Sequence, residues 1–365
     1  MLGGAWPSVA GVVGLALFHA VLVAFRSPAT FQESQFLVPF TQEAAGELPF
    51  GLYSRLVGGG VASLWTDPAD QLKALRLLST LFAVSTLLVL FITARGAFPR
   101  RRTLHIGAPL LLAATPSFTL ASGQAGPKAF VALLAALLIW LSLWTVQRGL
   151  TLFSFGGIVA LLLAGWQVDW GFWWLTWPVL LVVPAALWRH RDDDVLLIGQ
   201  IGVLIGTGIA LAGGIMVLGE SGHLLPWLSK LVRETEAIVA RSVWPTTDSL
   251  TVLFFRYWAD FTDPGHLWWG SVSLWTLISF AGLSVVLWQE HSAELIVPLA
   301  AVIVLGAGAL VVPDSVTSWP APAWPAAALL LAAGWPHLVP RRARPLWLLV
   351  GLLVVELLNL AALVG

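Results

Sequence analysis

The stretch that decides the fold opens with Phe31-Gln32-Glu33-Ser34-Gln35-Phe36-Leu37 and closes with Ala74-Leu75-Arg76-Leu77-Leu78-Ser79. It is the first long polar interval in a chain that is otherwise a succession of apolar runs. Connecting segments commonly carry binding and catalytic groups, while the elements around them provide the scaffold. We therefore expect any chemistry to lie in this interval.

The composition indicates a membrane protein. Of the 365 residues, 58% are hydrophobic and 10% are charged, and the mean hydropathy is +0.86. So much apolar surface cannot be hidden inside a water-soluble globule. The formal net charge is zero, so no long-range field recruits nucleic acid. The absence of cysteine excludes disulfides, thiol catalysis and cysteine-ligated metals.

The fold class that we predict is all-α, a polytopic bundle of about 11 transmembrane helices in a single integral membrane domain, 1–365. Apolar runs of about 18 to 24 residues are long enough to cross roughly 30 Å of hydrocarbon. We expect the first run to be a retained helix, because no basic segment precedes it. The predicted segments are 5–25, 72–94, 103–122, 128–147, 150–166, 170–188, 195–218, 267–288, 293–312, 320–338 and 346–364.

Lysine and arginine in the short loops predict the orientation. If the helices alternate, Lys128 is the one basic residue in the short loops of one side, while the other side collects ten. The basic side is expected to be cytoplasmic. The N-terminus is then cytoplasmic in a bacterial-type inner or plasma membrane, and the C-terminus is not. The ten are Arg95, Arg100, Arg101, Arg102, Arg148, Arg189, Arg191, Arg341, Arg342 and Arg344.

Two long intervals, 26–71 and 219–266, then lie outside the cytoplasm. The first contains short apolar pieces broken by glycine and proline, which favours interfacial helices. The second contains an amphipathic stretch, 224–243. Tryptophans near predicted helix ends, including Trp166, Trp177 and Trp324, are typical of an aromatic belt. Gln200 is interpreted as a helix-packing hydrogen-bonding residue.

The order of these features resembles the GT-C glycosyltransferases, closest to protein O-mannosyltransferases and lipid A aminoarabinose transferases. The likeness is carried by Gly46-Glu47-Leu48-Pro49-Phe50, by Ala74-Leu75-Arg76-Leu77-Leu78-Ser79 and by Ala114-Thr115-Pro116-Ser117-Phe118. It implies a GT-C-like fold, a polyprenyl-phosphate-linked sugar as donor and transfer on the non-cytoplasmic face. The implied site is the first external loop.

The chain departs from that family pattern at its acidic positions. Relatives carry an Asp-Glu pair where this chain has Gln32 and Glu33, and an amide cannot accept a proton as a general base. Glu33 is then the remaining candidate base. Relatives also show Pro-Asp where Lys128 follows Pro127, and a lysine near the position of Asp169. We predict that Lys128 and Asp169 form an ion pair, because a charge at the hydrocarbon edge is costly unless matched.

Other candidate substrate-binding residues are Arg55, Arg76 and His223. Arginine binds phosphate well through its bidentate geometry. Arg76 equally fits a side chain that extends to the interface or pairs with Asp70. For His223, interfacial residence without function is the favoured interpretation over contact with a head group. The histidines show no metal-ligand spacing, so we expect neither a metal nor a cofactor.

Three functions stay open from the sequence. The first is a transferase that uses Glu33 as base, and the second is a catalytically degenerate relative that serves as a membrane subunit or scaffold with protein partners. The alternative from another class is a transporter or lipid flippase. Against transport, no pair of interrupted helices occurs at matching positions in two halves of the chain.

Overall fold

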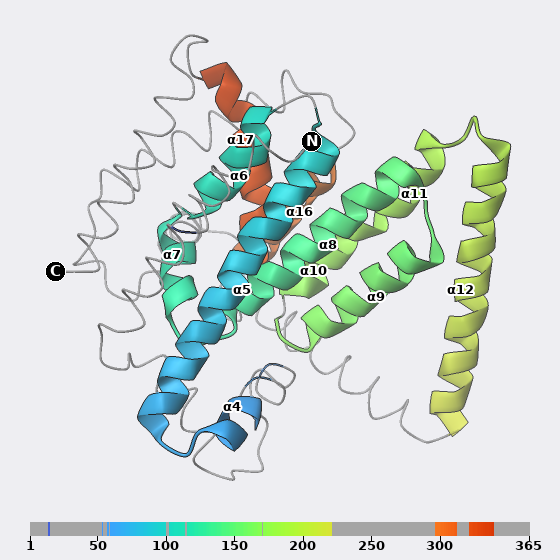
Figure 1. The fold of residues 1–365 in the computed structure, drawn as a ribbon. Coiled ribbons are helices and arrows are strands. Elements are labelled where there is room, and N and C mark those ends of the chain that lie inside the picture. The colour runs from blue at the N-terminus through green and yellow to red at the C-terminus, as the bar shows by residue number, and fades with distance from the viewer. Residues whose placement is uncertain are drawn as a thin grey trace.

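The computed structural model describes residues 59–99, 102–113, 115–169, 171–220, 296–311 and 321–338, together with Gly14, Tyr53 and Val57. Helices dominate these residues, and no strand occurs among them, which confirms the all-α prediction for this part of the chain (Figure 1). The helices are α4 Gly59–Leu64, α5 Pro68–Ala97, α6 Arg102–Ala113, α7 Pro116–Gly123, α8 Lys128–Arg148, α9 Leu152–Trp166, α10 Gly171–Leu180, α11 Val182–Arg189, α12 Asp194–Glu220, α16 Ile296–Val311 and α17 Trp324–Leu338.

Three helical stretches of the described part are long and apolar enough to cross a membrane: Pro68–Ala97, Lys128–Arg148 and Gly171–Arg189. Shorter apolar helices accompany them at Leu104–Ala113, Leu152–Trp166, Asp194–Ile209 and Trp324–Ala333. The membrane character of the chain is thereby supported. The count of eleven spans stays a prediction.

Proline explains why one predicted span is divided. The run 103–122 is two helices, α6 and α7, and Pro116 is the first residue of the second. The residue before a proline is disfavoured in the α conformation, and proline itself has no N–H to donate to the preceding turn. A helix therefore ends and a new one begins where a single span was expected.

Large apolar side chains lie exposed on the perimeter of the bundle. On α5 these are Leu77, Leu81, Leu88 and Ile92, which recur at helical spacing along one face. Soluble monomers rarely expose contiguous apolar surface of this kind. This face of α5 is suited to contact lipid, and the opposite face packs into the protein.

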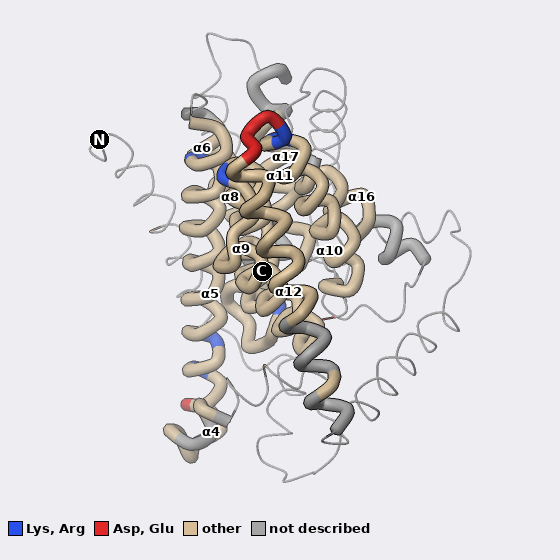
Figure 2. Tube along the Cα trace, turned by 90° about the vertical axis from the view of Figure 1, so that its right-hand side faces the viewer, with Lys and Arg blue, Asp and Glu red and all other residues tan. Residues whose placement is uncertain are grey.

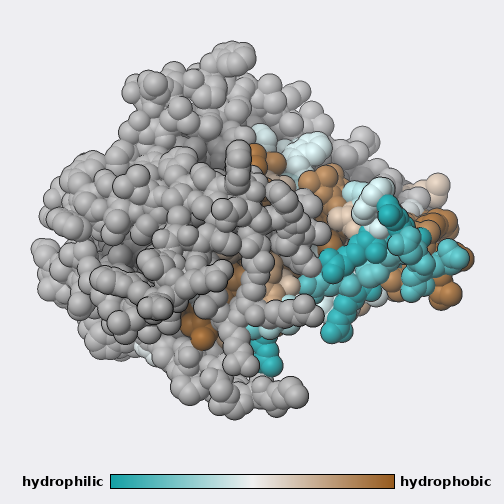
Figure 3. All heavy atoms as spheres, turned by 90° about the horizontal axis from the view of Figure 1, so that it is seen from above, coloured by the Kyte–Doolittle hydropathy of each residue, from teal (hydrophilic) through white to brown (hydrophobic). Residues whose placement is uncertain are grey.

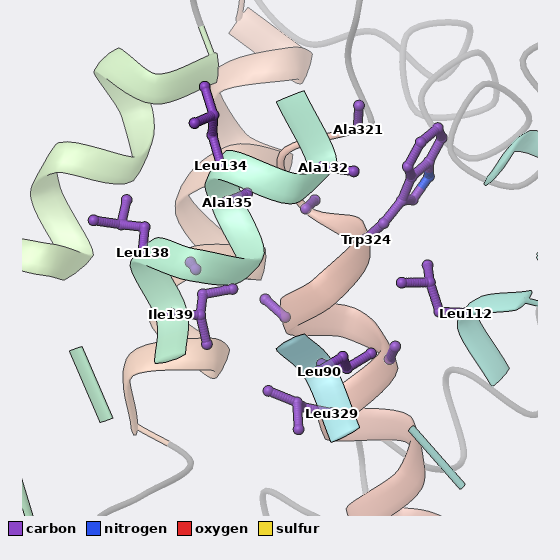
Figure 4. Packing of buried hydrophobic residues seen from close by; sticks show 14 of the residues in the cluster. Leu90, Leu112, Ala132, Leu134, Ala135, Leu138, Ile139, Ala321, Trp324 and Leu329 are labelled. Carbon is purple, nitrogen blue, oxygen red and sulfur yellow. The ribbon is translucent and has the colours of Figure 1, made fainter. Parts of the chain in front are cut away.

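Small and branched side chains fill the interior between α5, α8 and α17. Leu90 of α5, Ala135 and Leu138 of α8 and Leu329 of α17 are all buried in one cluster (Figure 4). Small residues let helices approach closely in membrane proteins. Trp324, predicted to lie in the aromatic belt, is instead 1% exposed in this core, and its ring meets that of Phe118 edge-on with the ring centroids 5.5 Å apart.

Two hydrogen bonds define the ends of the bundle. Gln147 Nε2 donates to the Ala97 carbonyl oxygen at 3.4 Å, so the last turns of α8 and α5 lie together. Thr80 Oγ1 donates to the Ser122 carbonyl oxygen at 3.1 Å, so the early part of α5 lies beside the turn that leads into α8. α5 and α8 therefore run in the same direction, and the chain returns from the end of α5 to the start of α8 through α6 and α7 (Figure 1).

Exposed basic side chains gather at the end where α5, α8 and α11 finish. Arg95, Arg148 and Arg189 stand in the last turns of these helices, and all three are exposed (Figure 2). Seen from above, hydrophilic residues gather at one side of the molecule next to apolar ones (Figure 3). Arg95, Arg148 and Arg189 thus share one end, as the alternation of helices predicted. Which side of the membrane that end faces stays a prediction.

Candidate functional site

The opposite end of the bundle holds buried polar side chains, and we call it the polar end. It consists of Tyr53, of Arg76 and Ser79 on α5, of Lys128 at the start of α8, and of Asp169 in the α9–α10 turn. These residues lie far apart in the sequence. The early part of α5 lies beside the end of α7, which leads into α8, Tyr53 lies near Ser79, and Asp169 lies close enough to Lys128 to be affected by its charge.

Local signals fix the start of α5 and thereby the position of Arg76. Asp67 is the N-cap and accepts a hydrogen bond from the Ala69 backbone N–H at 3.0 Å, and Pro68 occupies the first helical position. Both residue types are favoured at these positions. The helix therefore begins earlier than the predicted residue 72. Arg76 lies in its third turn, on the buried face.

Arg76 is 3% exposed, so its side chain packs within the protein and does not extend into water. Asp70, the partner suggested as an alternative, pairs with Lys73 at 3.0 Å on the exposed face. A buried guanidinium is costly unless its surroundings compensate its charge. Arg76 does interact within the protein, and its positive charge makes it a candidate for binding an anionic group as well.

Asp169 is 6% exposed, and its Oδ1 accepts a hydrogen bond from the Gly171 backbone N–H at 2.5 Å. Burial raises the pKa of Asp169 to about 6, and the Gly171 hydrogen bond and the positive charge of Lys128 offset part of that rise. Lys128 thus acts electrostatically on Asp169, in line with the predicted pairing. The direct salt bridge stays a prediction.

Two hydroxyls of the polar end were missed in the sequence. Tyr53 is 1% exposed and Ser79 is 0% exposed, and the Tyr53 hydroxyl lies beside Ser79 and the Gly126 backbone. Both neighbours favour the ionised phenol, but burial outweighs them and raises the pKa of Tyr53. Neither hydroxyl makes a hydrogen bond of acceptable geometry with the described residues. The sequence offers a signal for Tyr53 alone, since tyrosine occurs only twice in the chain.

Four predicted site residues, Gln32, Glu33, Arg55 and His223, lie outside the described residues. Their roles stay predictions. Within the described residues, no three histidine or acidic side chains come together in a way that could hold a metal ion.

The prediction that Gln200 forms a hydrogen bond between packed helices is wrong for the described part of the chain. Its side chain is 1% exposed and lies against Gly149, yet neither of its polar atoms finds a hydrogen-bond partner in the described part of the chain. The Gln200 side chain therefore contributes van der Waals contact with Gly149, whose φ is +90°.

A scan against protein-family models finds no match for the chain, and a search of curated proteins finds none either. The chemistry of the polar end is therefore argued from its own side chains. A guanidinium and an ammonium attract anions, and buried hydroxyls donate hydrogen bonds to them. The arrangement is suited to bind a phosphorylated or otherwise anionic group at the edge of an apolar bundle.

Proposed function

We propose that this chain is a GT-C-like membrane protein that binds a polyprenyl-phosphate-linked sugar at the polar end and no longer transfers the sugar efficiently. The observation that carries the proposal is that Arg76 is buried in the early part of α5, which a hydrogen bond from Thr80 to Ser122 joins to the end of α7, shortly before α8 begins at Lys128. A lipid with a phosphate head group presents its anion at the edge of the hydrocarbon, and the proposal puts the first turns of α5 and α8 at that edge.

The loss of transfer is argued from the acidic positions. Gln32 stands where the resembling family has an aspartate, and an amide cannot remove a proton from an acceptor hydroxyl. Asp169, the buried carboxyl of the polar end, lies near a lysine, which fits a structural role in charge balance. A protein that retains the lipid site without the base would serve as a lipid-binding subunit of a membrane complex.

Binding and transfer are tested on the same preparation of the full chain in an uncharged detergent. The probe is a radiolabelled polyprenyl-phosphate-linked sugar, and retention on the protein and label transfer to acceptors are measured separately. We expect retention without transfer. Arg76→Gln should lower retention at least tenfold because it removes the charge, and Arg76→Lys should lower it less because the charge remains.

Arg95→Gln is the matched control, because Arg95 belongs to the same helix but is exposed at its other end. Equal loss of retention in both glutamine variants would show a non-specific charge effect and refute the proposal. Transfer by the wild type that disappears in Glu33→Gln would instead establish an active enzyme. The lack of any retention by the wild type would refute lipid binding.

A further inference from the structure

Arg148, the last residue of α8, is an exposed cation that makes no ion pair with the described residues. The sequence contains no acidic residue between Asp70 and Asp169, so neither α8 nor α9 carries a carboxylate. The guanidinium carbon of Arg148 lies 5.6 Å from the centroid of the Trp144 ring. A contact with the face of a ring occupies no N–H donor of the guanidinium. Arg148 is therefore available to an anionic partner.

Apolar side chains lie next to Arg148 where α9 follows α8 (Figure 1). Trp144 stands one turn before Arg148, and its ring meets the Phe153 ring edge-on with the ring centroids 6.5 Å apart. Leu152 and Phe153, at the start of α9, are 70% and 72% exposed. We call Trp144, Arg148, Leu152 and Phe153 the α8–α9 corner. It combines a positive charge with exposed apolar surface.

An exposed apolar face of α9 continues from this corner. The residues that form this face recur at helical spacing, and they are Leu152, Gly156, Ala160 and Leu163. From Leu152 to Leu163 the face is about 17 Å long, and one leaflet of the hydrocarbon core is about 15 Å thick. The helix therefore offers contact to one acyl chain along its whole length, beginning beside a positive charge.

We propose that the α8–α9 corner binds an anionic phospholipid, with the phosphate at Arg148 and an acyl chain along the exposed face of α9. The inference concerns the end of the bundle opposite the polar end, and it does not depend on the proposed function. Arginine extends from the edge of the hydrocarbon to the level of the head groups, and tryptophan favours the same boundary. A guanidinium binds phosphate through paired N–H donors. Contact with the indole limits the motion of the arginine, so less conformational entropy is lost on binding.

A second arginine at this end has a similar ring contact and a different electrostatic environment. The guanidinium carbon of Arg191 lies 4.4 Å from the centroid of the Trp188 ring, but its Nε lies 3.6 Å from Oδ1 of Asp192. The next two residues are also exposed aspartates. Repulsion from these carboxylates opposes the binding of an anion at Arg191. Arg148 makes no ion pair with this acidic turn, so we expect the lipid phosphate at Arg148 and not at Arg191.

The test measures thermal stabilisation of the full chain in maltoside detergent as phospholipid is added. The probes are phosphatidylglycerol, phosphatidylcholine with the same acyl chains, and glycerol 3-phosphate, which carries the charge without the chains. We expect phosphatidylglycerol to stabilise the wild type most. Arg148→Gln should weaken phosphatidylglycerol binding about fivefold, the effect of one basic residue near an anionic head group, and Arg148→Lys should weaken it less because the charge remains. Because Arg148 is exposed, both variants should stay folded.

Arg191→Gln is the matched control, because it removes an arginine with the same kind of ring contact from the same end, and it should leave the affinity for phosphatidylglycerol unchanged. Equal weakening in Arg148→Gln and Arg191→Gln would show attraction to the overall charge of this end and would overturn the site. Equal stabilisation of the wild type by phosphatidylcholine would show that the anionic charge is not recognised. Equal stabilisation by glycerol 3-phosphate would show that no acyl chain is bound, and either result overturns the inference. Retention of the polyprenyl-phosphate-linked sugar is measured separately, so the proposed function can hold or fail independently.

Discussion

Asp169 provides the sharpest test of the polar end, because its substitution by asparagine has a calculable effect. Burial raises the pKa of this carboxyl from 3.8 to about 6. A raised carboxyl pKa means that the folded state binds the proton more tightly than the unfolded state does. The resulting stabilisation is fully present below pH 3.8 and is lost as the pH rises through about 6.

The magnitude follows from the size of the shift. About two pKa units at 1.36 kcal/mol each amount to about 3 kcal/mol that the ionised carboxylate costs the folded state near pH 7.5. Asparagine keeps the side-chain oxygen that accepts the Gly171 N–H and removes the charge. It also removes the attraction to Lys128. We therefore expect Asp169→Asn to stabilise the protein at pH 7.5 by about 1–3 kcal/mol.

The assay is thermal unfolding of wild type and variant in detergent at pH 4.5 and pH 7.5. We expect the apparent Tm of Asp169→Asn to exceed that of the wild type by a few degrees at pH 7.5, and the gap to shrink at pH 4.5. Asp192→Asn is the control, because Asp192 is 92% exposed. A variant that is less stable at both values of pH would mean that Asp169 stabilises the fold as an ion, and the reasoning from burial would be refuted.

Three further predictions concern packing and topology. Gly165→Ala should destabilise by about 1–3 kcal/mol in unfolding experiments because the added methyl meets the Phe172 ring, whereas Gly156→Ala on the same helix has open space and should be neutral or stabilising. Gly149→Ala should cost about 1–3 kcal/mol because φ is +90° and ψ is 164° at this position, and a tolerated alanine would show that the turn adjusts. Because the chain has no cysteine, Lys73→Cys and Asp192→Cys can be labelled singly in intact cells; we expect an impermeant thiol reagent to reach only the first, and the reverse pattern would invert the topology.

Within the described part of the chain, helix positions were largely predictable from the sequence because apolar runs of sufficient length have few alternatives in a membrane. The predicted spans 5–25, 267–288 and 346–364 lie outside the described residues. The predicted segment 128–147 agrees closely with Lys128–Arg148, and 195–218 agrees with Asp194–Glu220. The division of the run 103–122 was not predicted, because a proline effect on backbone geometry leaves hydropathy unchanged.

Only the charged residues of the candidate site could be predicted from the sequence. Arg76, Lys128 and Asp169 stand out in apolar surroundings, so each was singled out. The fold brings Asp169 near Lys128, and it brings the early part of α5 beside the end of α7 that precedes Lys128. Tyr53 and Ser79 could not be found in this way. Whether a hydroxyl in a helix is satisfied depends on the neighbours that tertiary packing supplies, and hydropathy does not encode those neighbours.

The two ends of the bundle differ in a way that membrane insertion does not explain. The basic side chains of one end, including Arg95, Arg148 and Arg189, are exposed, which is all that orientation by positive charge requires. At the polar end Arg76 and Asp169 are buried, and burial of a charge costs free energy that apolar residues of the same volume would not cost. A site that lowers stability in the free protein is expected where the free energy of ligand binding offsets the cost. We therefore expect stabilisation by a phosphorylated lipid to be largest in variants that keep Arg76.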